Sequence, residues 1–256
     1  MKTVLITGST SGIGLGIATE FAKTKQYNII FNGLETNGPE IAAEIGKNYG
    51  IEVMYSNANM LKPEELRKMV ADGISKFGKI DVLINNAGIQ HVSPIEDFPD
   101  DKWNAIIGIN LTSAFYLSKA VWPGMKERKF GRIINIASAH GLVASEFKSA
   151  YVSAKHGIVG LTKTLGLEGA PFNITCNAIC PGYVKTPLVE KQIADQAKAH
   201  NMSETDVVNK VMLLKQAVKE FVTVESIGLM ALFLAAETST TITGTALPID
   251  GGWNAQ

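Results

Sequence analysis

Tyr151 and Lys155 carry the most specific chemical signal in this sequence. They belong to the segment Tyr-Val-Ser-Ala-Lys, which opens a long stretch of helical period. Residues i and i+4 share one face of a helix, so the phenol and the ammonium point the same way. A nearby cation favours the phenolate and lowers a phenol pKa that is ordinarily about 10, which brings it closer to working pH. An ordinary amphipathic pair has the same spacing, so the prediction of a proton-transfer pair depends on the residues around it.

Two further polar residues favour that prediction. Ser138 ends a predicted strand upstream of the pair, where its hydroxyl can hydrogen-bond a substrate oxygen. Asn110 lies in an apolar stretch, and because a buried amide needs a partner, a bound water leading to Lys155 would supply one. We therefore predict a catalytic group of Asn110, Ser138, Tyr151 and Lys155.

Short apolar segments alternate with segments of helical period along the whole chain. Strands are expected at 3–7, 28–32, 52–56, 82–85, 131–137, 174–180 and 245–249. Helices are expected at 12–23, 39–49, 63–77, 101–125, 149–169 and 223–235. Such alternation predicts an α/β protein with one doubly wound (Rossmann) parallel sheet and helices on both faces. We expect residues 1–256 to form a single domain.

One region interrupts this alternation. Between Tyr183 and Glu220 the chain is mixed polar and helical, with a cap signal at 202–206. An insertion that follows Pro181-Gly182 and separates two buried strands would lie near a site at the strand ends. We predict that residues 183–220, called the lid segment below, form a helical cover over the substrate.

The first predicted strand is followed by the glycine-rich loop Gly8–Gly14 and then by a helix. Glycines permit a tight turn and close approach of backbone to a ligand. The helix amino terminus offers free N–H groups and a partial positive charge to a pyrophosphate. The spacing is Gly-x-x-x-Gly-x-Gly, and its place between strand and helix predicts a dinucleotide cradle rather than a turn that serves packing alone.

The end of the second predicted strand indicates which dinucleotide the cradle takes. In such folds an acid there binds the ribose 2′-OH of NAD, and an Arg accepts the 2′-phosphate of NADP. The segment 31–34 and the glycine loop contain neither Arg nor Lys. NAD is therefore favoured over NADP. The expected acid is also missing from that segment, unless Glu35 takes its role.

Amides follow the third and fourth predicted strands. Asn59 is placed where it could hold the adenine, although a simple turn is an equally good interpretation of its segment. The run Asn85-Asn86-Ala87-Gly88 can anchor the strand end and face the cofactor's ribose. Structural and cofactor roles are compatible at this second position.

Together these motifs resemble the short-chain dehydrogenase/reductase family over essentially the whole chain. The resemblance rests on Thr7-Gly8-x-x-x-Gly12-x-Gly14, Asn85-Asn86-Ala87-Gly88, Asn110, Ser138, Tyr151-x-x-x-Lys155 and Pro181-Gly182. It implies that Tyr151 is the catalytic acid/base, that Ser138 donates to the substrate oxygen, that Lys155 also binds the nicotinamide ribose, and that Asn110 holds a relay water. The cofactor contacts expected on this basis are Gly8, Thr10, Ser11, Gly12, Ile13, Gly14, Leu34, Asn59, Asn86, Ala87, Gly88, Tyr151, Lys155, Pro181, Gly182, Val184 and Thr186.

Within that family the chain is similar to the bacterial branch that oxidises D-3-hydroxybutyrate. The resemblance implies a small carboxylate held by Lys148, Gln90, His140 and Gln192, with Trp253 at the substrate's methyl end or closing the pocket. The expected reaction converts (R)-3-hydroxybutyrate and NAD to acetoacetate and NADH. Taken singly, Lys148 and Gln192 could equally be solvated surface residues, His140 could bond its own loop, and Trp253 could fill a core or an interface.

Two alternative functions stay open. The same chemistry could serve a 3-oxoacyl-carrier-protein or a polyol substrate, although carrier-protein reductases usually need NADPH and a basic docking surface. A non-catalytic dinucleotide sensor could use the same fold without turnover. Such a sensor has no need of the full set Asn110, Ser138, Tyr151 and Lys155, which argues against it.

Composition limits the partners. Lys plus Arg and Asp plus Glu both number 24, so no excess charge is available to bind nucleic acid or an anionic membrane. The apolar run at the amino terminus is too short for the core of a signal peptide. The histidines do not have metal-ligand spacing with an acid or a thiol, so no metal is expected. Cys176 and Cys180 are expected to be buried thiols, which suits the cytoplasm. Helices 101–125 and 149–169 could form the helix-bundle interface of the family's tetramers, so a homotetramer is expected.

Overall fold

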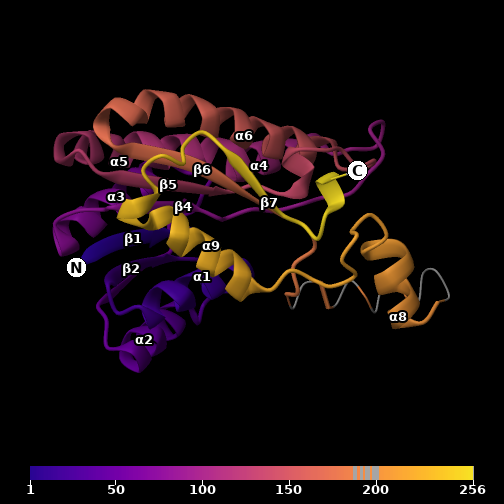
Figure 1. The fold of residues 1–256 in the computed structure, drawn as a ribbon, viewed down its shortest axis with the longest axis horizontal. Coiled ribbons are helices and arrows are strands. Elements are labelled where there is room, and N and C mark those ends of the chain that lie inside the picture. Colours follow the sequence, from indigo (N-terminus) through magenta and orange to yellow (C-terminus); the bar gives the residue numbers. More distant parts are fainter. Residues whose placement is uncertain (187–188, 191–192, 194–196, 198–201, 256) are drawn as a thin grey trace.

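Seven parallel strands form one sheet in the order β3-β2-β1-β4-β5-β6-β7 (Figure 1). They span Lys2–Ile6 (β1), Tyr27–Asn32 (β2), Val53–Ser56 (β3), Val82–Asn85 (β4), Gly131–Ile136 (β5), Ile174–Pro181 (β6) and Ala246–Ile249 (β7). This computed structural model describes residues 1–186, 189–190, 193, 197 and 202–255. The chain order reverses its direction across the sheet between β1 and β4, which is the topological switch point of a doubly wound fold. The predicted fold class is confirmed.

Helices cover both faces of the sheet. They are α1 (Gly12–Lys23), α2 (Gly38–Tyr49), α3 (Pro63–Phe77), α4 (Asp100–Ile107), α5 (Ser113–Arg128), α6 (Ser149–Gly169), α8 (Glu204–Val207) and α9 (Val224–Ala235). Phe21 of α1 and Leu234 of α9 pack with Ile6 of β1 on one face. Leu66 of α3 and Leu117 of α5 pack with strand residues on the other. Because both faces of the central strands are covered, β4, β5 and β6 are buried along their whole length and are mostly apolar, without the alternation of a half-exposed strand.

The helix predicted at 101–125 is interrupted, which corrects the sequence-based expectation. Between α4 and α5 the segment Gly108–Thr112 forms a π-helical turn, and the Ser113 N–H donates to the Gly108 carbonyl. Asn110 lies inside this turn and is buried. A π turn inserts one extra residue into a helix, and such turns are frequent at functional sites.

The lid segment leaves the sheet after β6 and returns to the body of the protein just before α9. Val184 pairs with Val222 in a short parallel bridge. In between, Ser203 caps α8 by accepting a hydrogen bond from the Asp206 N–H at 3.1 Å, as the cap signal in the sequence predicted. In Figure 1 the part of this segment around α8 projects beyond the carboxyl ends of the strands. Its described part therefore lies next to the strand ends where a ligand would bind.

Two further features of the described residues bear on function. Cys176 and Cys180 are buried free thiols in β6, as expected. None of the helices in the described part of the chain is long and apolar enough to cross a membrane.

Candidate active site

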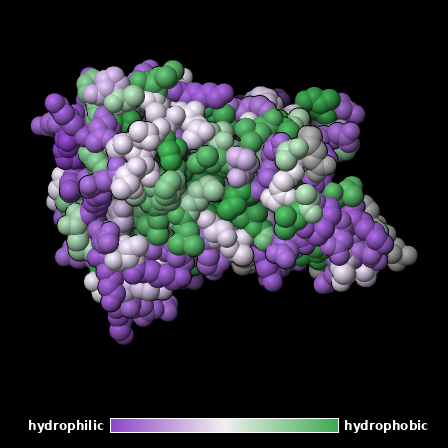
Figure 2. Space-filling view, in the orientation of Figure 1, coloured by the Kyte–Doolittle hydropathy of each residue, from purple (hydrophilic) through white to green (hydrophobic). Residues whose placement is uncertain are grey.

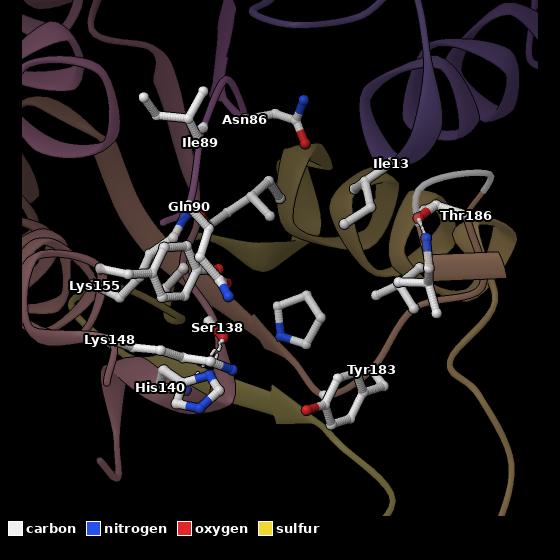
Figure 3. Close-up of a pocket in the computed structure, with 18 of the residues that line it drawn as sticks. Ile13, Asn86, Ile89, Gln90, Ser138, His140, Lys148, Lys155, Tyr183 and Thr186 are labelled. Carbon is white, nitrogen blue, oxygen red and sulfur yellow. Dashed lines mark hydrogen bonds between the residues drawn. The ribbon is translucent and has the colours of Figure 1, made fainter. Parts of the chain in front are cut away.

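A cavity of about 840 Å³ opens at the carboxyl ends of the strands, at the switch point (Figure 3). Its lining includes most of the residues predicted from the sequence: Ile13, Asn86, Gly88, Gln90, Ser138, His140, Lys148, Tyr151, Lys155, Pro181, Gly182, Val184, Thr186 and Trp253. The predicted catalytic, substrate and cofactor residues thus come from distant parts of the chain to one cavity. Gln192 lies outside the described residues.

Lys155 is held inside the site by a single strong hydrogen bond. Its Nζ donates to the carbonyl of Ile136, the last residue of β5, at 2.7 Å. The side chain is buried, and burial lowers the pKa of Lys155 to about 8. The ammonium lies 5.5 Å from the centroid of the Tyr151 ring, so the predicted pair does share one face of α6.

Tyr151 differs from the sequence-based expectation in its electrostatics. Burial raises the pKa of Tyr151, while its hydrogen bond with Ser138 lowers it by less. The expected decrease of the phenol pKa is therefore wrong, because the net shift is upward. Loss of water destabilises the buried phenolate by more than the hydrogen bond with Ser138 stabilises it. Formation of the phenolate in this site depends on the charge of Lys155 and on hydrogen bonds from the substrate side.

Ser138 lies directly after β5 and orders the turn that follows. Its Oγ accepts a hydrogen bond from the His140 N–H at 3.2 Å, and Nδ1 of the same histidine lies 3.5 Å away. Residues 139–141 form a short 3₁₀ turn for which Ser138 is the N-cap. The hydroxyl thus faces Tyr151 from a rigid strand end, where it can also bind a substrate oxygen.

The side chain of Asn110 is engaged with the backbone rather than directed toward a water and Lys155. Its Oδ1 accepts from the Ile89 N–H and its Nδ2 donates to the Ile89 carbonyl, both at 2.9 Å. These two bonds satisfy the buried amide and fix the chain that follows β4. The prediction of a buried amide with a partner is correct, but the partner is a peptide group of the Gly88–Gln90 segment.

His140 is a buried, neutral histidine. Its Nε2 lies 2.7 Å from the Ser145 hydroxyl, and its ring meets Tyr151 and Trp253 edge-on at centroid distances of 6.0 and 5.1 Å. Burial, with Lys148 and Lys215 adding to it, lowers the pKa of His140 to about 4. The ring bonds its own loop, as one of the two alternatives predicted, and it also lines the cavity, so its contact with a substrate stays a prediction.

The cavity carries positive charge near His140. Lys148 precedes α6 and lines the cavity; burial and the nearby Lys215 both lower the pKa of Lys148. The Lys215 ammonium lies 5.9 Å from the Trp253 ring centroid. Burial and a neighbouring cation both destabilise the charged form of Lys148, and a bound anion would stabilise it. This end of the cavity is therefore suited to a carboxylate.

Aromatic rings close the wall opposite the glycine loop. Trp253 is buried, and its ring stacks on Tyr183 with centroids 5.8 Å apart and an interplanar angle of 11°. Figure 3 shows Tyr183 facing the cavity across from His140 and Lys148. Gln90 also reaches into this space. The resulting pocket has an apolar wall on one side and polar donors on the other.

The glycine loop has the shape that a pyrophosphate cradle requires. Gly8 and Gly12 adopt φ values of 59° and 53°, which other residues adopt at a cost. A Cβ at Gly14 would lie 2.0 Å from the Gly8 carbonyl oxygen, so only glycine fits there. Thr7 and Asn86 hold the loop, because Asn86 Nδ2 donates to both the Thr7 and the Gly8 carbonyls. The residues present therefore fit a dinucleotide.

Glu35 supplies the acid that was missing at the end of β2. Its carboxylate accepts hydrogen bonds from the Thr10 and Ser11 hydroxyls and from the Leu34 N–H. These bonds, that of Thr10 above all, lower the pKa of Glu35, so it carries a full negative charge at neutral pH. Glu35 is therefore placed beside the glycine loop, where the adenosine ribose of a dinucleotide would lie.

Asn59 has the turn conformation that the sequence left open. Its Oδ1 accepts from the Leu61 N–H at 2.9 Å, and its own N–H donates to Glu65. The side-chain oxygen is thus occupied by the turn that precedes α3.

Sequence reasoning missed two contributors to the site. Ser145 fixes the His140 ring, and Tyr183 stacks on Trp253. Thr7 was part of the glycine-loop motif, and the structure adds its contact, since Thr7 Oγ1 accepts from the N–H groups of Asn86 and Ala87. Ser145 and Tyr183 lie in irregular segments whose course no periodicity reveals.

Comparison with known proteins agrees with this geometry. The profile of the short chain dehydrogenase family matches residues 2–197. The chain belongs to the short-chain dehydrogenase family. It is 52% identical to a D-beta-hydroxybutyrate dehydrogenase of Rhizobium meliloti, over 100% of this chain and 99% of that protein. It is 50% identical to a D-beta-hydroxybutyrate dehydrogenase of Cupriavidus necator, over 100% and 98%.

A solved structure shows the same fold. It is a variant of actinorhodin polyketide ketoreductase crystallised with NADPH, with a TM-score of 0.92 and 30% sequence identity. The alignment covers 100% of this chain and 98% of the ketoreductase. The family that the motifs indicated is thereby confirmed.

The low pKa of His140 predicts a loss of stability in acid. The folded-state pKa of about 4 lies below the ordinary 6.5, so the neutral ring stabilises the fold above pH 6.5 and this contribution is lost as the pH falls toward 4. By roughly pH 5 the loss amounts to about 2 kcal/mol. Urea unfolding of the wild type and of His140→Gln between neutral and acid pH measures it. Parallel pH dependences in the two proteins would contradict the assignment.

Proposed function

We propose that this protein oxidises (R)-3-hydroxybutyrate to acetoacetate reversibly, with NAD as its cofactor. The observation that carries the proposal is the half-buried Lys148 cation beside His140 and Gln90, a short reach from the Tyr151 phenol and the Ser138 hydroxyl. One site thus offers a carboxylate partner and a proton-transfer group to the same small molecule. The two relatives named for D-beta-hydroxybutyrate, each matched over its whole length, support the same substrate.

Tyr151 and Ser138 act on the C3 hydroxyl. Ser138 donates to the substrate oxygen, and Tyr151 accepts the hydroxyl proton during oxidation and returns it during reduction. The Lys155 ammonium stabilises the phenolate that forms, which offsets part of the burial cost at Tyr151. When bound, NAD supplies the hydride acceptor for C3.

Lys148, His140, Gln90 and Gln192 orient the substrate. The Lys148 ammonium pairs with the carboxylate, and the neutral donors add hydrogen bonds that fix its direction. Trp253, stacked on Tyr183, packs against the methyl end. Closure of the lid segment excludes water while the proton moves.

Cofactor choice depends on Glu35. In this proposal the cradle consists of Gly8, Thr10, Ser11, Gly12, Ile13 and Gly14. Of the other expected contacts, Asn86, Gly88, Pro181, Gly182, Val184 and Thr186 line the cavity. Leu34, Asn59 and Ala87 complete the proposed set. The Glu35 carboxylate accepts the ribose 2′-OH of NAD and repels a 2′-phosphate. This repulsion also argues against a reductase that uses NADPH.

Two further expectations complete the proposal. The enzyme works as a homotetramer, which would cover the apolar side chains that α6 and α9 expose, such as Leu167 (77% exposed), Leu229 and Phe233. Figure 2 shows apolar side chains gathered across the face that α9 crosses. The enzyme works in the cytoplasm, where reducing conditions suit the buried Cys176 and Cys180.

The substrate assignment predicts a selective effect of Lys148. Lys148→Ala should raise KM for (R)-3-hydroxybutyrate about 10- to 150-fold, the value of one hydrogen bond to a charged group. Turnover of 2-butanol, which has no carboxylate, should not change. Steady-state assays with NAD measure both substrates, and Lys163→Ala on the exposed side of α6 is the matched control.

Equal effects of Lys148→Ala on the two alcohols, or an unchanged KM for the hydroxy acid, would remove Lys148 from the carboxylate site. Tyr151→Phe should abolish turnover of both alcohols. Persistent activity in that variant would overturn the proposed chemistry rather than the substrate.

Glu35→Gln should change cofactor preference. Loss of the carboxylate removes the repulsion of a 2′-phosphate, so kcat/KM with NADP should rise about tenfold relative to kcat/KM with NAD. Glu40→Gln is the control, because Glu40 is exposed in the first turn of α2 and makes no bond to the glycine loop within the described residues. If the NADP to NAD ratio is the same in both variants and the wild type, Glu35 does not select the cofactor.

A further inference from the structure

A second cavity lies at the opposite edge of the sheet, at the amino ends of the strands. Its volume is about 570 Å³, and it is lined by Lys2, Lys79, Asp81, Arg128, Phe130 and Arg132, with Asn173 and Glu237. Lys2 begins β1, and Arg132 is the second residue of β5. In Figure 1 this edge lies near the amino terminus, on the far side of the sheet from the lid segment. The cavity is therefore separate from the catalytic site.

The charges that line this cavity do not balance. Lys2 pairs with Glu237 at 2.9 Å, and Lys79 pairs with Asp81 at 3.5 Å. Within the described part of the chain these two carboxylates form ion pairs with the lysines and with neither arginine. Glu237 also acts on the Arg132 guanidinium, but at a longer range than a salt bridge. Four cationic and two anionic side chains line the cavity, so its net charge is positive and favours an anion there.

Arg132 has a donor that the protein leaves unused. Its side chain is fully buried, at 0% exposure. Its Nε donates to the Ala236 carbonyl, and its Nη1 donates to the Gly131 and Asn173 carbonyls. Nη2 is buried and has no hydrogen-bond partner among the described residues. A buried charged donor without a partner is costly, and an oxyanion at Nη2 would accept from one or both of the two N–H groups that this nitrogen carries.

Arg128 and Phe130 shape the entrance to this donor. Arg128, at the end of α5, directs Nη2 to the Ile80 carbonyl at 2.7 Å, which holds its guanidinium at the cavity wall. The Phe130 ring lies 4.4 Å from the Arg132 guanidinium carbon and 4.8 Å from the Lys2 ammonium. The flat fork of an arginine binds the oxygens of a carboxylate or phosphate in pairs.

We propose that this cavity is a binding site for the carboxylate or phosphate group of a small metabolite, held between Arg128 and Arg132. Arg132 has its first function in the fold, because it donates to the Gly131 and Asn173 carbonyls at the starts of β5 and β6 and to the Ala236 carbonyl at the end of α9. Its Nη2 and the Arg128 guanidinium form the ligand site. The bound anion stabilises the start of β5, the strand that ends at Ile136, two residues before Ser138.

Calorimetric titration of the full-length enzyme with inorganic phosphate and, separately, with acetate tests the proposal. Saturating NADH occupies the glycine loop, so that phosphate cannot bind there, and ionic strength is held constant. The wild type should bind at least one of the two anions, and the stronger one identifies phosphate or carboxylate as the preferred group. Arg128→Gln should weaken that binding about tenfold or more, and Arg67→Gln, an exposed arginine on α3, should not.

The activity of each variant serves as the folding check, since neither arginine belongs to the catalytic cavity. If Arg128→Gln does not fold, Lys79→Glu places a negative charge in the same cavity and should weaken binding to a similar degree. No uptake of either anion by the wild type would overturn the proposal. Equal affinity in the wild type and in the folded cavity variant would overturn it as well.

Discussion

The hydrogen bond from the Lys155 ammonium to the Ile136 carbonyl determines the geometry of the catalytic site. It joins the first turns of α6 to the last residue of β5, at 2.7 Å and away from water. Ser138 follows Ile136 by two residues, and Tyr151 precedes Lys155 by one helical turn. The same bond therefore sets how far the phenol, the hydroxyl and the ammonium lie from one another. A shift of α6 against β5 would disturb all three groups together.

Burial shifts the pKa values of the titratable groups in this site and destabilises their charged forms. Loss of water raises the pKa of Tyr151 and lowers the pKa values of Lys155, Lys148 and His140. Each charged form is thus destabilised until an opposite charge or a hydrogen-bond partner from a bound ligand stabilises it. A carboxylate near Lys148 and an alcohol oxygen near Ser138 meet these needs at the two ends of one small molecule. The site is in this sense complementary to a short hydroxy acid.

Much of the fold and of the site could be predicted from the sequence, and the failures share one cause. The buried strands were visible as apolar runs, and the Gly8–Gly14 loop and the Tyr151–Lys155 spacing were visible because their residue types are required locally. The π turn around Asn110, the reach of Glu35 to Thr10, and the net direction of the Tyr151 pKa were not. Each of these depends on contacts between groups that are distant in the sequence or on local backbone geometry. The hydrophobic period and the spacing of residue types do not indicate either.

Burial places beside Tyr151 an ammonium that gives up its proton more readily than an exposed lysine does. The titration of Lys155 can be followed by NMR in protein labelled with ¹⁵N at the lysine side chains, with the signal assigned by its absence in Lys155→Met. We expect the Lys155 ammonium to lose its proton near pH 8. A titration near the ordinary lysine value of 10.5 would show that burial does not lower the pKa of this group.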